Sequence, residues 1–153
     1  MPGEVRAVMD VALMLLSLCG PGHAALAPLV AREAARYEPH RPAVLVAMAR
    51  VESTCDPSAE DGRGDYGLLQ IRVGTRAARG HTAEELKRPR LNLHLGAAHL
   101  ADRLRLCNGN LLFALYVYAG RKKCRDYGAD KYGRDYARRV LRWTEQAERE
   151  DES

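Results

Sequence analysis

The sequence predicts a mostly α-helical protein with a single compact core. Apolar residues recur at helical intervals in most segments, glycine- and asparagine-containing breaks separate these segments, and few stretches alternate as a β-strand would. The chain has 153 residues, enough for one core and too few for two ordinary domains. Apolar residues make up 46% and charged residues 29%, which is a globular composition.

The formal net charge of +4 says little about partners. A modest positive excess suits any anionic polymer, including nucleic acid bound weakly. The sequence contains no basic cluster interleaved with aromatic residues and no nucleic-acid-binding motif. We therefore expect no nucleic-acid partner.

Residues 1–24 predict an export signal. Residues 11–18 form an apolar stretch too short to span a bilayer, and small residues follow at Gly22 and Ala24. The expected cut follows Ala24, with Ala27 as the latest alternative. An ordinary buried N-terminal helix is the less favoured interpretation. We thus expect an exported protein, periplasmic or extracellular, without a stable membrane span.

Two helices are expected next, over 29–37 and 42–52. The second is apolar on all sides from Ala43 to Ala49, and Pro42 suits the first turn of a helix. Glu52 stands at the exit of this buried segment. Desolvation there disfavours the charged carboxylate, so its pKa should rise towards the range of a general acid. The alternative is a helix-end glutamate in contact with water.

Turn residues fill the stretch from 56 to 65 and predict a long polar loop. Thr82 and Glu85 have the spacing of a capping box, which begins a short helix. Asn92 is expected to cap a longer helix in which Leu93, Ala97 and Leu100 recur at helical intervals.

The C-terminal third predicts two more helices and a tail. The break at 108–110 precedes an apolar helix over 111–119. A last helix begins near Asp130, with Tyr132, Tyr136 and Val140 on one face. Residues 145–153 are charged and are expected to form a frayed tail.

Cys107 and Cys124 are the natural disulfide pair, because they bracket one apolar segment. Such a loop is worth ~3 kcal/mol in the chain-entropy model. Cys19 falls inside the predicted signal, which leaves Cys55 odd and able to capture one of the other two. No spacing typical of a zinc site is present, so we expect no metal.

Two motifs resemble a known family. Glu52-Ser53, with the turn over 56–59 behind it, is similar to the glutamate-serine motif of the soluble lytic transglycosylases. The segment 67–71, Gly-Leu-Leu-Gln-Ile, resembles the glycine-leucine-methionine-glutamine signature of that family, with Leu69 in place of methionine. Residues 92–100 and 114–120 resemble two further family segments. The resemblance covers nearly all of the expected domain at 28–144.

The resemblance implies a lysozyme-like single domain of packed helices with a catalytic cleft. It further implies cleavage of peptidoglycan glycan strands between N-acetylmuramic acid and N-acetylglucosamine, by a monomer without a cofactor. Glu52 would protonate the glycosidic oxygen and then accept the proton of the C6 hydroxyl, which attacks C1 and gives a 1,6-anhydro product. One carboxylate then suffices, whereas ordinary glycosidases use two. Ser53 and Gln70 are the expected substrate-binding residues beside the acid. Gln70 would hydrogen-bond a substrate acetamide or help place the sugar, and Ser53 would brace the acid or the loop; alternatively, Ser53 only stabilises the turn.

The tyrosine of the family pattern is displaced in this chain. Counting back from Gly120 places that tyrosine on Val117. Counting forward from the alanine-leucine pair at 114–115, with one residue deleted, places it on Tyr118. We prefer Tyr118, because a hydroxyl near the acid is chemically useful, and keep Tyr116 as a second candidate. Alternatively, these residues only pack the helix.

Two other functions are weighed against the lyase. A goose-type muramidase would need a carboxylate to hold water, for which Asp56, Asp61 and Asp65 are the nearby candidates. Enzymes of that type typically carry an aspartate two residues after the glutamine, where this chain has Arg72. The third function is a non-enzymatic wall-binding module or a structural piece of a secretion apparatus.

Overall fold

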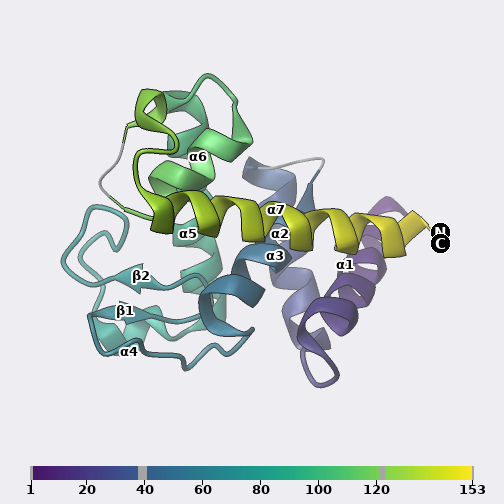
Figure 1. The fold of residues 1–153 in the computed structure, drawn as a ribbon. Coiled ribbons are helices and arrows are strands. Elements are labelled where there is room, and N and C mark those ends of the chain that lie inside the picture. The colour runs from purple at the N-terminus through teal and green to yellow at the C-terminus, as the bar shows by residue number, and fades with distance from the viewer. Residues whose placement is uncertain (1, 38–40, 121–122, 153) are drawn as a thin grey trace.

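The computed structural model describes residues 2–37, 41–120 and 123–152, which form a helical fold with one small β-hairpin (Figure 1). The predicted mostly α fold is confirmed. The α-helices are α1 (Gly3–Cys19), α2 (Ala27–Tyr37), α3 (Pro42–Ser53), α4 (Ala83–Leu86), α5 (Pro89–Leu106), α6 (Leu111–Tyr118) and α7 (Lys131–Glu152). Two 3-10 turns, η1 (Ala24–Leu26) and η2 (Cys124–Asp126), and the strands β1 (Asp65–Tyr66) and β2 (Ile71–Arg72) complete the fold.

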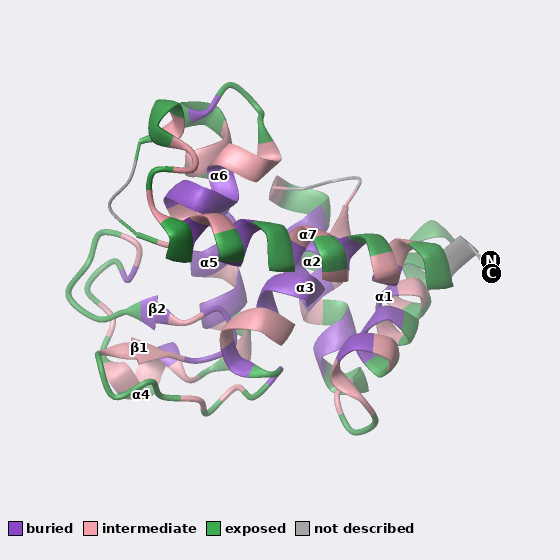
Figure 2. Cartoon of the chain, in the orientation of Figure 1, coloured by how far each residue is buried: buried purple, intermediate pink, exposed green. Residues whose placement is uncertain are grey.

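Helix α3 is the centre of the core. Its residues 43–49 are all buried, and it packs against α1, α2 and α7 (Figure 2). The long helix α7 runs across α3 and reaches α1 at its far end (Figure 1). Helix α3 ends because Thr54 and Cys55 adopt left-handed conformations, with φ of 53° and 64°. A helix that is apolar all round therefore brings its last turn, which carries Glu52, to the edge of the core.

The segment after α3 returns through the hairpin and is fastened to α5 by Asn92. The Asn92 side chain accepts a hydrogen bond from the Leu69 N–H (2.7 Å) and donates to the carbonyls of Tyr66 (2.8 Å) and Leu86 (2.7 Å). Helix α5 begins at Pro89, so Asn92 lies in its first turn and the predicted capping role is wrong. Its fully buried amide instead satisfies loop backbone groups far away in the sequence.

Two glycines leave space for the close contact between the loop and α5. A Cβ atom on Gly67, whose φ is +82°, would collide with the Asn92 amide and the Leu86 carbonyl. A Cβ atom on Gly96 would collide with the Leu69 side chain. The glycines at these two positions therefore allow the loop and α5 to approach closely.

The N-terminal segment is a packed helix in this structure. Helix α1 buries Val11, Met14, Leu15 and Leu18 and contacts α3 and α7. The export signal over residues 1–24 stays a prediction. No described helix is both long and apolar enough to cross a bilayer.

Two disulfides join distant parts of the fold. Cys107 and Cys124 are bonded, as predicted, and connect the end of α5 to η2. Cys55 is not odd, because it pairs with Cys19 at the end of α1. The second bond was missed because Cys19 had been placed in a segment expected to be removed.

The capping box is confirmed and the frayed tail is not. Thr82 accepts from the Glu85 N–H, and the Glu85 side chain accepts from the Thr82 N–H. Helix α7 continues to Glu152, with Thr144 and Ala147 fully buried. The segment predicted to fray therefore packs through one face of a longer helix.

Removal of residues 1–24 is expected to destabilise the fold severely. The deletion would remove the four buried side chains of α1, whose burial is worth roughly 1.5–3 kcal/mol each. It would also delete a disulfide worth ~2–4 kcal/mol. The sum is comparable to the whole stability of a small domain, ~5–15 kcal/mol. Thermal unfolding followed by circular dichroism should show a cooperative transition for the full chain. The fragment 25–153 should show no cooperative transition at the melting temperature of the full chain.

The double variant Cys19→Ser/Cys55→Ser of the full chain is the matched control, since it removes only the disulfide and should lose a smaller part of the stability. A 25–153 fragment that melts at the temperature of the full chain would show that α1 is dispensable.

Candidate active site

Glu52 lies in the last turn of α3 and keeps partial exposure to solvent. Burial raises the pKa of its carboxyl group to about 8, and the negative charges of Asp65 and Asp61 add to the shift. No hydrogen bond or ion pair to this carboxyl forms within the described part of the chain. Glu52 is therefore mainly protonated at neutral pH and remains within reach of solvent.

Ser53 is turned towards α3 rather than outwards. Its hydroxyl donates to the Ala49 carbonyl at 3.0 Å and is buried. The Cys19–Cys55 disulfide follows two residues later. Both interactions fix the end of α3, and the role of Ser53 stays a prediction.

Gln70 holds the loop that faces the end of α3. The residue has a left-handed backbone (φ 49°), and its Nε2 donates to the carbonyls of Gly67 (2.9 Å) and Ala59 (3.3 Å). Its side chain stays partly exposed. The amide nitrogen is thus used inside the loop, while Oε1 has no donor among the described residues.

Of the two candidate tyrosines, Tyr118 lies beside Glu52. Its hydroxyl donates to the Leu69 carbonyl at 3.1 Å, and its ring packs on His99 with ring centres 4.9 Å apart. Burial raises the pKa of Tyr118 well above 10, and the charge of Glu52 contributes. Tyr116 is placed in the core instead: its hydroxyl donates to Asp126 and accepts from the Asp130 N–H, at η2 and the loop before α7.

Tyr136 of α7 is a site residue that the sequence did not reveal. Its ring stacks on Tyr118, with centres 6.4 Å apart, and only 5% of the residue is exposed. Burial raises the pKa of Tyr136 well above 10, and Glu52 is the next cause. Its buried hydroxyl has no partner among the described residues. Tyr136 shares a helix face with core residues, and this periodicity concealed it.

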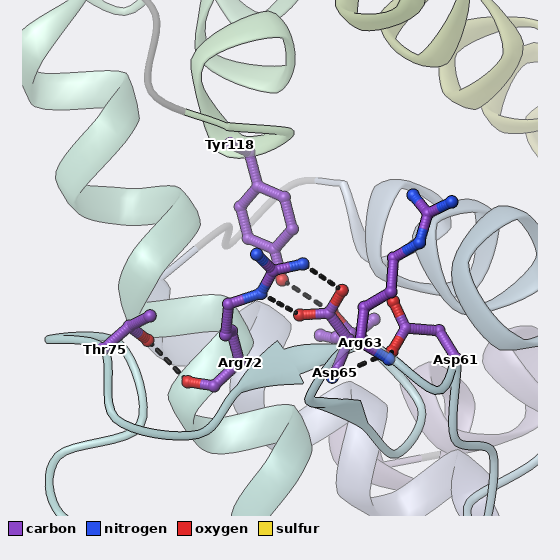
Figure 3. Close-up of polar contacts among 7 residues, drawn as sticks. Asp61, Arg63, Asp65, Arg72, Thr75 and Tyr118 are labelled. Atoms are coloured by element: carbon purple, nitrogen blue, oxygen red, sulfur yellow. Dashed lines mark hydrogen bonds and ion pairs between the residues drawn. The ribbon is translucent and has the colours of Figure 1, made fainter.

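Asp65 and Asp61 of the hairpin region, whose polar contacts are drawn in Figure 3, also raise the pKa of Glu52. Asp65 on β1 faces Arg72 on β2, whose Nε and Nη2 donate to its two carboxylate oxygens, both at 2.9 Å. Asp61 accepts from the backbone N–H groups of Arg63 (2.7 Å) and Asp65 (3.0 Å). Asp56 is used elsewhere, since it accepts from the backbone and hydroxyl of Ser58.

Glu52 belongs to no grouping of metal ligands among the described residues and to neither of two surface hollows. Among the described residues, no three His, Cys, Asp or Glu side chains are grouped so that they could hold a metal ion. Two surface hollows, of about 450 and 390 Å³, lie near Cys107–Cys124 and between α2 and α5, and Glu52 lines neither. The chemistry of Glu52 and its neighbours, rather than the size of a hollow, therefore identifies the candidate site.

Residues 29–140 match the family described as the Transglycosylase SLT domain, and the chain belongs to this family. The family predicted from the sequence motifs is thereby confirmed. The structure is also similar to the X-ray structure of an inactive glutamate-to-glutamine mutant of the lytic transglycosylase Slt from Pseudomonas aeruginosa, with a TM-score of 0.73 and 25% sequence identity. The similarity covers 89% of this chain and 25% of that chain, so the present chain spans about a quarter of that enzyme. The comparison with curated proteins gives no match.

The raised pKa of Glu52 predicts that Glu52→Gln stabilises the protein at neutral pH. Between pH 4.5, the ordinary value, and about pH 8, the unfolded chain carries an ionised Glu52 while the folded chain keeps it protonated. The stability therefore falls as pH rises through this window. At pH 7 the cost is on the order of 1–3 kcal/mol, which glutamine, being neutral and of similar volume, removes.

Urea unfolding at pH 4 and pH 7 measures this effect. The variant and the wild type should be equally stable at pH 4, and the variant more stable at pH 7. Glu145→Gln, on an exposed position of α7, is the control and should show no such difference. Equal stability of Glu52→Gln and wild type at both pH values would mean that Glu52 ionises normally.

Proposed function

We propose that the protein is a peptidoglycan lytic transglycosylase. In this proposal it cleaves the β-1,4 bond between N-acetylmuramic acid and N-acetylglucosamine and forms 1,6-anhydro-muramic acid. The observation that carries the proposal is the single carboxyl group of Glu52, kept protonated by burial at the solvent-accessible end of α3. Membership of the SLT family and the similarity to a lytic transglycosylase support it.

The reaction uses Glu52 first as an acid and then as a base. Its proton passes to the glycosidic oxygen while the bond from that oxygen to C1 breaks and positive charge develops on the sugar. The resulting carboxylate accepts the proton of the C6 hydroxyl, whose oxygen bonds to C1. The nucleophile belongs to the reacting sugar, so its attack gains from proximity and needs no second carboxylate.

The neighbouring side chains have positions that suit supporting roles. Glu52 acts on both Tyr118 and Tyr136. The buried Tyr136 hydroxyl has no partner among the described residues, so it can hydrogen-bond the Glu52 carboxyl group. The free Oε1 of Gln70 can accept from an acetamide N–H of the substrate. Ser53 supports the end of α3 and does not need to touch the glycan.

The two disulfides support an exported enzyme, since disulfides persist in the periplasm and outside the cell. The glycan substrate of the proposed reaction also lies outside the cytoplasm. Periplasmic or extracellular action is therefore part of the proposal.

The hydrolytic alternative is less well supported. Hydrolysis needs a carboxylate that is free to take a proton from water. Asp65, the carboxylate with the larger effect on Glu52, has both oxygens bonded to Arg72. A non-enzymatic wall-binding module gives no reason for a carboxyl group with so high a pKa.

Product analysis of digested wall sacculi tests the proposal. The full-length oxidised protein should release muropeptides that end in 1,6-anhydro-muramic acid, each one water lighter than the corresponding hydrolysis product. Glu52→Gln keeps the volume of the side chain but supplies no proton, so it should reduce release by at least ~10³-fold. Mass spectrometry of the soluble products and the turbidity of the sacculi provide the two readouts.

Reducing-end muropeptides from the wild type would show a hydrolase. Binding to sacculi without release of soluble products would support the non-enzymatic wall-binding module instead. Lysis by Glu52→Gln at the wild-type rate would remove Glu52 from the mechanism.

A further inference from the structure

The hairpin fixes Arg72 directly opposite Asp65. The two residues are register partners of the antiparallel strands β1 and β2, so their side chains lie on the same face of the hairpin. The guanidinium donates one N–H to each carboxylate oxygen at 2.9 Å, the bidentate geometry that holds a carboxylate in one orientation (Figure 3).

Asp65 lies close to the reacting group of the proposed mechanism. After burial, its charge is the largest cause of the raised pKa of Glu52, and it also acts on the Tyr118 hydroxyl. Glu52 approaches from α3, while Asp65 approaches from β1. Two carboxyl groups from separate elements thus influence one another, and hydrolytic glycosidases use two carboxyl groups.

The exposure of the two partners differs. The side chain of Asp65 is 19% exposed and that of Arg72 is 53% exposed, so the guanidinium lies on the solvent side of the pair. Burial and the neighbouring Asp61 raise the pKa of Asp65, and the guanidinium of Arg72 acts against this rise. Both carboxylate oxygens accept from the guanidinium, so neither can take a proton from water without breaking a charge-assisted bond. Asp65 is thereby a second carboxylate that Arg72 withholds from base catalysis.

We propose that the Arg72–Asp65 ion pair determines the product of the reaction by preventing Asp65 from activating water. The inference rests on the lytic transglycosylase function proposed above. With the pair intact, the C6 oxygen bonds to C1 and its proton passes to Glu52. With the pair broken, a water oxygen bonds to C1 instead, one water proton passes to Asp65, and the sugar leaves with a free reducing end. Glu52 regains its proton from solvent, and Asp65 releases the one it accepted.

Arg72 is a positioning residue in this account, and the ratio of products reports on it. In Arg72→Ala both oxygens of Asp65 become free, so the proportion of reducing-end to 1,6-anhydro muropeptides should rise at least tenfold over wild type. Arg72→Lys keeps the charge but not the two-bond geometry and should give an intermediate ratio. Arg72→Ala/Asp65→Asn lacks the carboxylate and should return to the wild-type ratio.

Arg63 provides the matched control, because it is an exposed arginine of the same loop whose side chain makes no ion pair within the described residues. Arg63→Ala should keep the wild-type product ratio. Thermal melts of all variants verify folding, and Arg72→Lys carries the test if Arg72→Ala does not fold.

The outcomes separate this inference from the proposed function. Folded Arg72 variants that are slower but keep the wild-type ratio of products would show that the ion pair only supports the hairpin. This result would overturn the inference but not the proposed function. A reducing-end fraction that persists in the double variant would exclude Asp65 as the base. Reducing-end products from the wild type itself would instead overturn the proposed function.

Discussion

The burial of one carboxyl group at the end of α3 is the constraint on which the rest of the site depends. Helix α3 is apolar on every side, so its last turn stays crowded by neighbouring elements even where it meets solvent. Among the residues that the structure describes, Glu52 has no ionic partner to stabilise its charge, and two nearby aspartates oppose ionisation further. The fold keeps this energetically unfavourable carboxyl group in place because the surrounding packing fixes α3.

Several distant elements hold the end of α3. The Cys19–Cys55 disulfide joins it to α1, the Ser53 hydroxyl bonds back to the helix, and α7 covers it and contributes Tyr136. On the other side, Asn92 fastens the Leu69 backbone, whose carbonyl in turn receives the Tyr118 hydroxyl. One buried asparagine thus connects α5 to the loop and to α6, which explains why residues far apart in the sequence converge on Glu52.

Local sequence patterns predicted the helices, the capping box, the Cys107–Cys124 bond and the position of Glu52, because each depends on residues close together in the chain. The features that were missed depend on long-range contacts. Asn92 is a typical capping residue near a helix start, and only its bonds to the hairpin reveal its role. The face of α7 that carries Tyr136 has the periodicity of a core face, and the Arg72–Asp65 pair requires the strand register. The contacts of α1 with α3 and α7 are also long-range.

The central claim is that Glu52 keeps its proton at neutral pH. Carbon-13 NMR of the protein labelled at glutamate side-chain carboxyl carbons measures this directly, with Glu52→Gln identifying the resonance. The account predicts a titration midpoint for the Glu52 carboxyl near pH 8, well above the ordinary glutamate value of 4.5. A Glu52 midpoint near the ordinary value of 4.5 would contradict the account, because the residue would then be ionised at neutral pH and unable to serve as the acid.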